Sequence, residues 1–222
     1  LLDWSDRNTA VLFGDGAGAV VIEESKNKSD GEIYSFSNGL SSDNLEILEI
    51  PNFGSAMDRF NPDEAARVRW TFDGQEIFKS GVRAMAQASA EAIEKSGLSK
   101  EDVDIFIPHQ ANIRIVEALE KKLGLPNATT IKKVHRYGNT SAASIPTAFV
   151  DALEEGEIKG GEIAVFTAVG AGLAWGACAV RLGDRVTPIN KSDAKLPDFD
   201  GTATDTIKRA IEYQVPDKLD KI

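Results

Sequence analysis

Histidine and cysteine often carry acid–base and nucleophilic chemistry, and this sequence has two histidines and one cysteine. His109 follows Pro108, after an expected strand over residues 103–107 and just before an expected helix. Sites of α/β proteins form at such strand ends, and the helix dipole there would keep the imidazole neutral. His135 lies in a basic run over residues 132–136 with no acidic residue beside it, and we expect a surface or supporting position. His109 is therefore the stronger catalytic candidate.

Asn139 and Cys178 both admit ordinary structural interpretations. Asn139 follows Gly138 at the start of an expected helix over residues 140–153, where asparagine is among the best N-cap residues. Its position alone does not indicate catalysis. Cys178 lies in an apolar run of the kind that buries inert thiols, so we do not expect it to act as a nucleophile. A single cysteine also excludes an intramolecular disulfide and a cysteine metal cluster.

Metal and nucleotide chemistry have little support in the sequence. It contains no HExxH motif, no GxxxxGK[ST] loop and no spaced Cys/His set, so we predict neither a metal site nor a cofactor. The glycine-rich motif GDGAG at residues 14–18 joins two apolar runs, residues 9–13 and 19–23. We expect these runs to form a hairpin of two strands. A nucleotide-binding glycine loop would instead run from a strand into a helix.

The elements that must position these residues form an α/β pattern. Asp73 and Glu76 resemble a capping box at the start of a helix, and Gly124 and Gly156 are typical helix ends. The patterns predict further strands over residues 32–38, 103–107, 162–169 and 173–182, helices over residues 73–97, 113–123, 140–153 and 203–213, and an irregular segment over residues 39–69.

An internal similarity indicates a duplicated architecture. Residues 10–18, AVLFGDGAG, align without gaps on residues 164–172, AVFTAVGAG. Several strands and helices precede the second copy, whereas only a few residues precede the first. We therefore expect two similar halves, of which the first lies largely outside this sequence. The chain also starts at Leu1 rather than at a methionine, which favours a preceding portion or a second polypeptide.

Composition narrows the classes of partner. The formal net charge of -10 and the pI of about 4.8 argue against a nucleic-acid partner, which would need a concentrated basic face. The sequence has no apolar run long enough to span a bilayer and no charged-then-apolar leader, so we predict no membrane association. With a single cysteine, a cytoplasmic location is the expectation.

Three motifs in this order and spacing resemble the C-terminal blocks of 3-oxoacyl-acyl-carrier-protein synthase III: PHQANIR at residues 108–114, YGNTSAASIP at residues 137–146 and GAGLAWG at residues 170–176. FGDGAGA at residues 13–19 and DGQEIFK at residues 73–79 are also similar, so the resemblance covers residues 1 to about 182. It implies a thiolase-like duplicated α/β/α/β/α sandwich. This chain would hold the last strands of the first half with an irregular interface segment, residues 1–68, the whole second half, residues 69–182, and a polar extension, residues 183–222.

The resemblance also implies a site of cysteine, histidine and asparagine that condenses an acyl-CoA primer with malonyl-acyl-carrier protein in fatty-acid or related polyketide biosynthesis. His109 and Asn139 would donate hydrogen bonds to the developing enolate oxygen, and the backbone N–H near Ala171 would serve the acylation step. Most relatives have glycine at the position of Ala171. The acylated cysteine belongs to the family's N-terminal half, so a preceding portion or a partner chain must supply it. The family also favours a homodimer of complete protomers.

Basic residues of one helix form the implied docking face for the carrier protein and the phosphates of coenzyme A. Arg114 and Lys121 lie seven residues apart and share a helix face, with Lys122 adjacent. A solvated helix face without function is the alternative. The segment at residues 51–55 matches the family's dimer and entrance stretch only loosely, and the extension from Gly183 onward has no counterpart in the usual family pattern.

Two other functions stay open at this point. The same fold supports relatives that join two acyl chains or transfer acyl groups to oxygen or nitrogen. A non-catalytic scaffold subunit is the alternative from a different class, although it would have no physical reason to keep both His109 and Asn139. Expressed alone, the segment is expected to aggregate, because an incomplete sheet leaves edges and an apolar face exposed.

Overall fold

The computed structural model describes residues 2, 4, 6–43, 45–51, 70–187, 193–195, 198 and 200–214. Its strands are β1 (Glu32–Leu40), β2 (Leu48–Glu49), β3 (Thr71–Phe72), β4 (Ile105–Pro108), β5 (Thr129–Thr130), β6 (Ile163–Gly170) and β7 (Ala174–Arg181). Its α-helices are α1 (Arg7–Ala10), α3 (Gly74–Lys95), α4 (Ile113–Leu123), α5 (Val134–Tyr137), α6 (Ser144–Glu154) and α7 (Ala203–Gln214). Short 3-10 helices are η1 (Lys28–Asp30), η2 (Leu45–Ile47), η4 (Lys100–Asp102) and η5 (Ser141–Ala143).

A mixed five-stranded sheet in the order β1-β7-β6-β4-β5 organises these elements. β6 and β7 form an antiparallel hairpin, β1 pairs antiparallel with β7, and β4 lies parallel to both β5 and β6. In the register of the hairpin, Phe166 lies opposite Cys178. Because β4 and β6 run parallel, their carboxyl ends lie at the same edge of the sheet, where an α/β site is expected.

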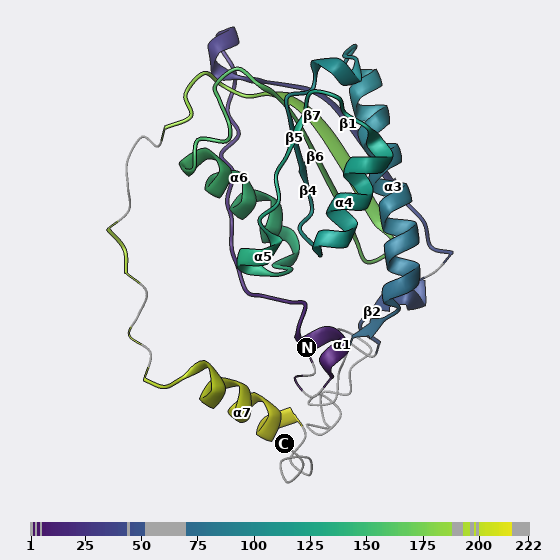
Figure 1. Ribbon diagram of the computed structural model, residues 1–222, viewed down its shortest axis with the longest axis vertical. Helices are drawn as coiled ribbons and strands as arrows, with labels where there is room; N and C mark the ends of the chain where they lie inside the picture. Colours follow the sequence, from purple (N-terminus) through teal and green to yellow (C-terminus); the bar gives the residue numbers. More distant parts are fainter. Residues whose placement is uncertain are drawn as a thin grey trace.

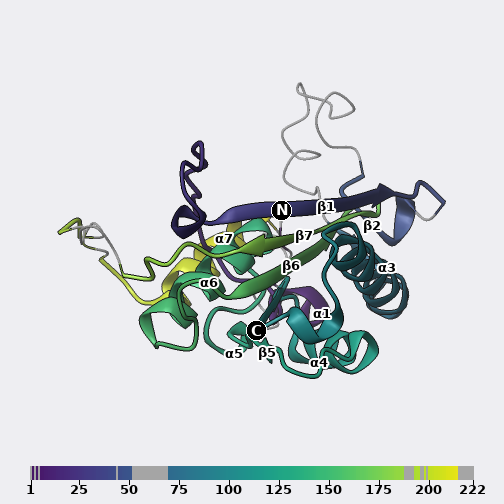
Figure 2. The ribbon, with the colours of Figure 1, turned by 90° about the horizontal axis from the view of Figure 1, so that it is seen from above.

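Helices cover both faces of the sheet. Figures 1 and 2 show α3 and α4 on one side and α6 on the other. Alternate residues of β4 serve the two layers: Phe106 packs into the cluster with Met85 and Leu119, whereas Ile105 and Ile107 pack into the cluster with α6. This two-sided burial explains why β4 reads as a continuous apolar run. The α/β class is confirmed: the described residues form this five-stranded sheet with helices on each side, and a separate two-stranded sheet of β2 and β3.

The boundaries predicted for the helices over residues 73–97 and 113–123 agree closely with α3 and α4, whereas the helix predicted over residues 140–153 begins at Ser144, after η5. The Asp73 side chain accepts hydrogen bonds from the backbone N–H groups of Gln75 and Glu76, which caps α3. α4 begins after the N-cap residue Asn112 and ends at Gly124, whose φ of 60° is the left-handed conformation that glycine adopts without strain. The strands predicted over residues 32–38, 162–169 and 173–182 and the helix predicted over residues 203–213 are also present.

The hairpin predicted over residues 9–23 is wrong. Residues 7–10 form the short helix α1, and residues 14–26 have no strand assignment. A strand needs a neighbour for its backbone N–H and C=O groups, and the described residues offer none to this segment beyond a bridge of Phe13 to Asn139. Val20, Val21 and Ile22 are consequently 76%, 89% and 77% exposed. In this structure the internal sequence similarity is therefore not matched by two similar hairpins.

Two regions remain, the segment between β1 and β3 and the C-terminal helix α7. The irregular segment predicted over residues 39–69 is only partly irregular, because β1 extends to Leu40 and residues 45–49 form η2 and β2. Residues 52–69, with most of the loosely matching entrance stretch, lie outside the described residues. Figure 1 shows α7 apart from the sheet, although Ile211 on it is buried. None of the helices in the described parts of the chain is long and apolar enough to cross a membrane.

Candidate active site

A cavity of about 1190 Å³ lies at the carboxyl end of β4 and β6. His109, Asn139 and Ala171 all line it, although they come from three separate parts of the chain. The first residues of α3, Gly74 and Gln75, form one further wall of the cavity, and the turn between β6 and β7 forms another. The structure thus brings together the three residues that the family resemblance assigns to the site.

His109 is held by its backbone and by its ring. The backbone N–H donates to the Thr167 carbonyl oxygen of β6 at 2.7 Å, and ring Nδ1 lies 2.6 Å from the Ser144 hydroxyl oxygen at the start of α6. Burial lowers the pKa of His109 to about 4, because the charged imidazolium loses its hydration. The ring is therefore neutral near pH 7, as expected. The cause is burial, however, because α4 begins only after Asn112, so His109 is not at the helix N-terminus we assumed.

Asn139 is fixed on both sides of its backbone by the segment around Phe13. Its N–H donates to the Leu12 carbonyl oxygen at 2.8 Å, and its carbonyl oxygen accepts from the Gly14 N–H at 3.0 Å. The side-chain oxygen accepts the Ser141 N–H at 2.9 Å, at the start of η5. The N-cap position of η5 is Thr140 and that of α6 is Ala143, so the predicted role of Asn139 as the helix N-cap is wrong. With that oxygen occupied, the side-chain NH₂ group is the part that can donate to a ligand.

The glycines of the GDGAG motif allow close packing against the Asn139 segment. A Cβ atom at Gly14 would overlap the Tyr137 carbonyl oxygen, and one at Gly16 would lie 3.1 Å from Thr140 Cβ. We predicted that these glycines permit a tight turn between strands. They instead permit the approach of one backbone to another, which is a second common use of glycine.

Ala171 lies in the turn between β6 and β7 and is exposed to the cavity side. Its neighbour Gly172 has a φ of 138°, a backbone conformation that disfavours a side chain, and a Cβ there would lie 2.8 Å from the Ala174 nitrogen. The position of Ala171 is compatible with a backbone donor to a ligand oxygen.

Aromatic residues that the sequence analysis did not single out form another part of the wall. The Phe13 ring stacks on Trp70 with a centroid distance of 5.7 Å and meets Phe72 edge-on at 6.1 Å. All three rings line the cavity. The sequence signal that could have indicated this wall is the pair of aromatic residues, Trp70 and Phe72, just before the helix cap Asp73. An apolar wall opposite polar donors is typical of a site for an acyl thioester or another partly apolar ligand.

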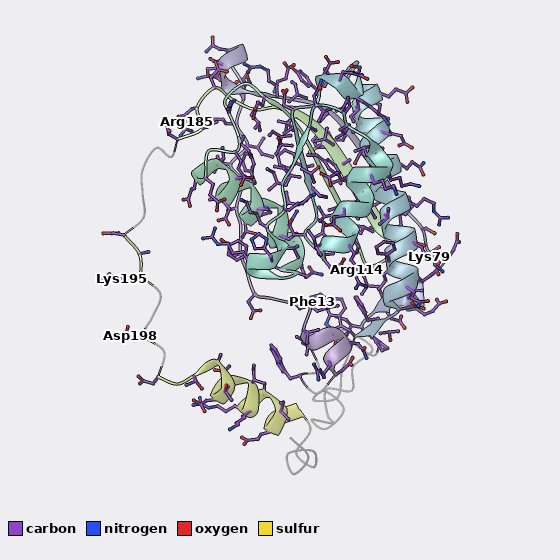
Figure 3. The ribbon with its side chains drawn as sticks, viewed as in Figure 1. Phe13, Lys79, Arg114, Arg185, Lys195 and Asp198 are labelled. Carbon is purple, nitrogen blue, oxygen red and sulfur yellow. The ribbon has the colours of Figure 1, made fainter. Side chains whose placement is uncertain are left out.

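The basic residues predicted for docking lie outside the cavity. Arg114, Lys121 and Lys122 are all exposed on α4. Figure 3 shows Arg114 at the same end of the molecule as Phe13, a cavity residue. Lys121 lies about 10 Å further along the helix axis, since each residue of an α-helix rises 1.5 Å.

The surroundings of His135 differ from the prediction. His135 itself is exposed on α5, as expected. Its basic neighbours have acidic partners that are distant in sequence: Lys133 Nζ lies 2.6 Å from both Glu155 and Glu157, and Arg136 lies 3.0 Å from Asp151. These ion pairs connect α5 to the end of α6 and the residues just after it. The basic residues 132–136 therefore stabilise the packing of this region and do not form an open basic patch.

The described part of the chain offers neither a reactive thiol nor a set of metal ligands. Burial raises the pKa of the Cys178 thiol on β7, which disfavours the nucleophilic thiolate. Among the residues described by the structure, no group of three or more His, Cys, Asp or Glu side chains could hold a metal ion.

Sequence comparisons identify related proteins over most of the chain. Residues 1–41 match the family model for 3-oxoacyl-[acyl-carrier-protein] synthase III, and residues 93–182 match the model for its C-terminal domain. Beta-ketoacyl-[acyl-carrier-protein] synthase III 2 of Vibrio cholerae is 48% identical over 217 residues, which cover 96% of this chain and 58% of that protein. The Bacillus pumilus beta-ketoacyl-[acyl-carrier-protein] synthase III is 47% identical over 184 residues, which cover 82% of this chain and 54% of that protein.

Solved structures agree with these matches. The 3-oxoacyl-[acyl-carrier-protein] synthase III of Aquifex aeolicus matches with a TM-score of 0.69 and 40% identity, over 81% of this chain and 53% of that chain. The Pseudomonas aeruginosa enzyme of the same name matches with a TM-score of 0.73 and 33% identity, over 84% of this chain and 55% of that chain. The chain thus spans little more than half the length of these relatives. The Vibrio alignment is long enough to include most of the extension after residue 182.

Proposed function

Because the chain belongs to the 3-oxoacyl-[acyl-carrier-protein] synthase III family, we propose that it forms part of an acyltransferase that carries out a decarboxylating Claisen condensation. The substrates are an acyl-CoA primer and malonyl-acyl-carrier protein, and the pathway is fatty-acid or related polyketide biosynthesis. Residues 69–182 form the C-terminal half of the thiolase-like fold in this proposal. The observation that supports it most strongly is the shared cavity of His109, Asn139 and Ala171.

The proposed reaction has two stages. A cysteine thiolate attacks the primer thioester and becomes acylated, while coenzyme A leaves as the thiolate. Malonyl-acyl-carrier protein then loses carbon dioxide, and the electrons of the broken C–C bond form an enolate. The enolate carbon attacks the acyl-cysteine thioester, the C–S bond breaks, and the cysteine thiolate is regenerated with release of the 3-oxoacyl-carrier protein.

His109 and Asn139 stabilise the enolate in this mechanism. Negative charge develops on the malonyl thioester oxygen as carbon dioxide departs. A neutral imidazole N–H and an amide N–H can both donate to that oxygen without transferring a proton. The lowered pKa of His109 supports this role, because an imidazole that remains neutral near pH 7 serves as a donor with no change of charge. The Ala171 N–H donates during cysteine acylation.

The acylated cysteine comes from outside residues 1–222 in this proposal, either from a preceding portion or from a partner chain. Cys178 is the sequence's single cysteine, and its raised pKa and position on β7 do not suit the role. Arg114, Lys121 and Lys122 on α4 provide positive charge for the acidic carrier protein and the phosphates of coenzyme A. The active species is a homodimer of complete protomers.

Malonyl decarboxylation by the full-length protein tests the two donor roles separately from the cysteine. We expect His109→Ala and Asn139→Ala each to lower its kcat about 10²–10³-fold, which is the usual cost of one oxyanion donor. His135→Ala, which truncates an exposed histidine, is the matched control and should retain the parental rate. Parental rates in both His109→Ala and Asn139→Ala would refute the proposed donor roles of these residues. The mass of the product then separates this condensation from a transfer of the acyl group to oxygen or nitrogen.

A further inference from the structure

Ser144 connects the two segments that carry the cavity residues. Its hydroxyl oxygen lies 2.6 Å from His109 Nδ1 and accepts the Gln110 backbone N–H at 3.2 Å. Ser144 lines the cavity but is only 2% exposed, so its hydroxyl is largely shielded from solvent. A single buried oxygen at the start of α6 thus contacts both residues that follow β4.

The number of protons around this oxygen decides the direction of the bond to His109. A backbone N–H can only donate, so Ser144 accepts from Gln110. The hydroxyl has one proton of its own, and a buried donor without an acceptor is strongly disfavoured. Nδ1 of His109 is the acceptor that lies within hydrogen-bond distance of it. If Nδ1 carried the ring proton instead, Ser144 would accept two bonds and its own proton would need another acceptor.

The Gln110 side chain holds this arrangement in place. Its Nε2 donates to the Pro108 carbonyl oxygen at 2.7 Å and to the Ile131 carbonyl oxygen at 3.2 Å, and its Oε1 accepts the Lys133 N–H at 2.8 Å. Gln110 is buried, and its side-chain oxygen and nitrogen both have partners. The backbone N–H that it presents to Ser144 is therefore rigidly placed, which leaves the Ser144 proton directed to the histidine.

We infer that Ser144 is a positioning residue that fixes the His109 ring as the tautomer protonated at Nε2, with that N–H available to the oxygen of the substrate in the cavity. This inference rests on the proposed function, in which His109 is a hydrogen-bond donor. The ring of a neutral histidine carries one proton. Without a donor at Nδ1, the ring would divide between two tautomers, and the tautomer protonated at Nδ1 would present a lone pair to the enolate.

The tautomer can be observed directly in the unaltered full-length protein. A long-range ¹H–¹⁵N correlation spectrum of ¹⁵N-histidine-labelled protein at pH 7 distinguishes a neutral ring protonated at Nε2, a neutral ring protonated at Nδ1 and an imidazolium. The spectrum of His109→Ala identifies the His109 signals by their loss. The first pattern is expected. Either of the other two patterns would overturn the inference, whatever the rate of the enzyme.

Substitutions then connect the tautomer to the rate. We expect Ser144→Ala to add signals of the Nδ1-protonated ring and to lower kcat for malonyl decarboxylation about tenfold with little change in KM, a smaller loss than removal of the donor itself. Ser144→Thr keeps the hydroxyl and should restore the tautomer. Ser89→Ala is the matched control, because it removes another buried hydroxyl, which bonds to the Met85 carbonyl oxygen within α3.

The two proposals fail in different ways. An unchanged His109 tautomer in a folded Ser144→Ala variant would refute the positioning role of Ser144. A parental rate in His109→Ala would refute the proposed donor role while leaving the tautomer measurement valid. If Ser144→Ala does not fold, the spectrum of the unaltered protein still decides the tautomer.

Discussion

The carbonyl oxygen of Asn139 accepts a hydrogen bond from the backbone N–H of Gly14 at 3.0 Å, so a residue near the start of the chain directly holds a candidate catalytic residue. The Asn139 N–H is held in turn by the Leu12 carbonyl oxygen. These two bonds make the segment around Gly14 part of the framework of the site, even though it contributes no catalytic side chain.

Gly14→Ala should therefore damage the site through the backbone. The added Cβ overlaps the Tyr137 carbonyl oxygen, so either segment must move and Asn139 moves with it. We expect the kcat for malonyl decarboxylation to fall at least about tenfold, because small displacements of a donor weaken its bond to the developing charge. Steady-state kinetics on the full-length protein measures the change. The control is Gly124→Ala, which strains the end of α4 at a φ of 60° and should lower stability by about 1 kcal/mol without reducing kcat.

The lowered pKa of His109 predicts a loss of stability in mild acid. The folded state holds this pKa at about 4, below the ordinary value of 6.5 that applies in the unfolded chain. The unfolded state therefore binds more protons between these values, and stability from this group is present above pH 6.5 and lost as the pH falls toward 4. The complete effect is about 3 kcal/mol.

Denaturant unfolding of the full-length protein at pH 7 and at pH 4.5 measures this linkage. The difference in unfolding free energy between the two pH values should be smaller in His109→Gln than in the parental protein, because glutamine does not titrate. His135→Gln is the control and should retain the parental difference, since that side chain is exposed. Equal differences in all three proteins would contradict the assignment to His109.

Cys178 should react slowly with iodoacetamide in the native protein. Cys178 is half-buried, and this burial raises the pKa of its thiol, so little thiolate is present near pH 8. Peptide mass spectrometry after timed alkylation compares Cys178 with the same residue in denaturant. A catalytic cysteine elsewhere in the full-length protein should be modified much earlier. Equal rates for Cys178 in native and denatured protein would contradict the raised pKa of the folded-state thiol.

Residues 1–222 expressed alone should bind a hydrophobic dye and aggregate. Val20, Val21 and Ile22 are mostly exposed, and β1 is an edge strand that also exposes Phe36 and Leu40. Replacing Val20, Val21 and Ile22 together by threonine should reduce both dye fluorescence and light scattering, because threonine keeps the branched shape but adds a hydroxyl. A monomer with one sharp unfolding transition and no dye binding would refute this prediction.

Sequence patterns correctly predicted those helices and strands whose caps, apolar spacing or pairing partners lie within a short stretch of the chain. The helix over residues 74–95 has its cap and its apolar spacing within the segment, and β6 and β7 are joined by a short turn that keeps their pairing local. The runs at residues 9–13 and 19–23 looked equally strand-like. Their failure to form strands follows from the missing neighbour, which a pattern within the segment does not reveal.

The site was predictable in part for a similar reason. The motifs identified His109 and Asn139, and both line one cavity. The neutrality of His109 was predicted from a helix dipole but arises from burial, which depends on tertiary packing. Ser144 lies 35 residues from His109, so their contact could not be read from spacing. The stacking of Phe13 on Trp70 is likewise a long-range contact between segments that have no pattern in common.

The packing of the GDGAG motif has a consequence for the mutational tolerance of the protein. Main-chain atoms make the bonds to Asn139, and Asp15 and Ala17 are exposed, so these two positions should accept most residues in a saturation library. Gly14, Gly16 and Gly18 should accept almost none, because each Cβ would meet the segment 137–146. The three glycines carry no functional side chain, yet they would be among the least variable positions in the protein. Selection there acts against any Cβ atom, because the two backbones pack too closely to admit one.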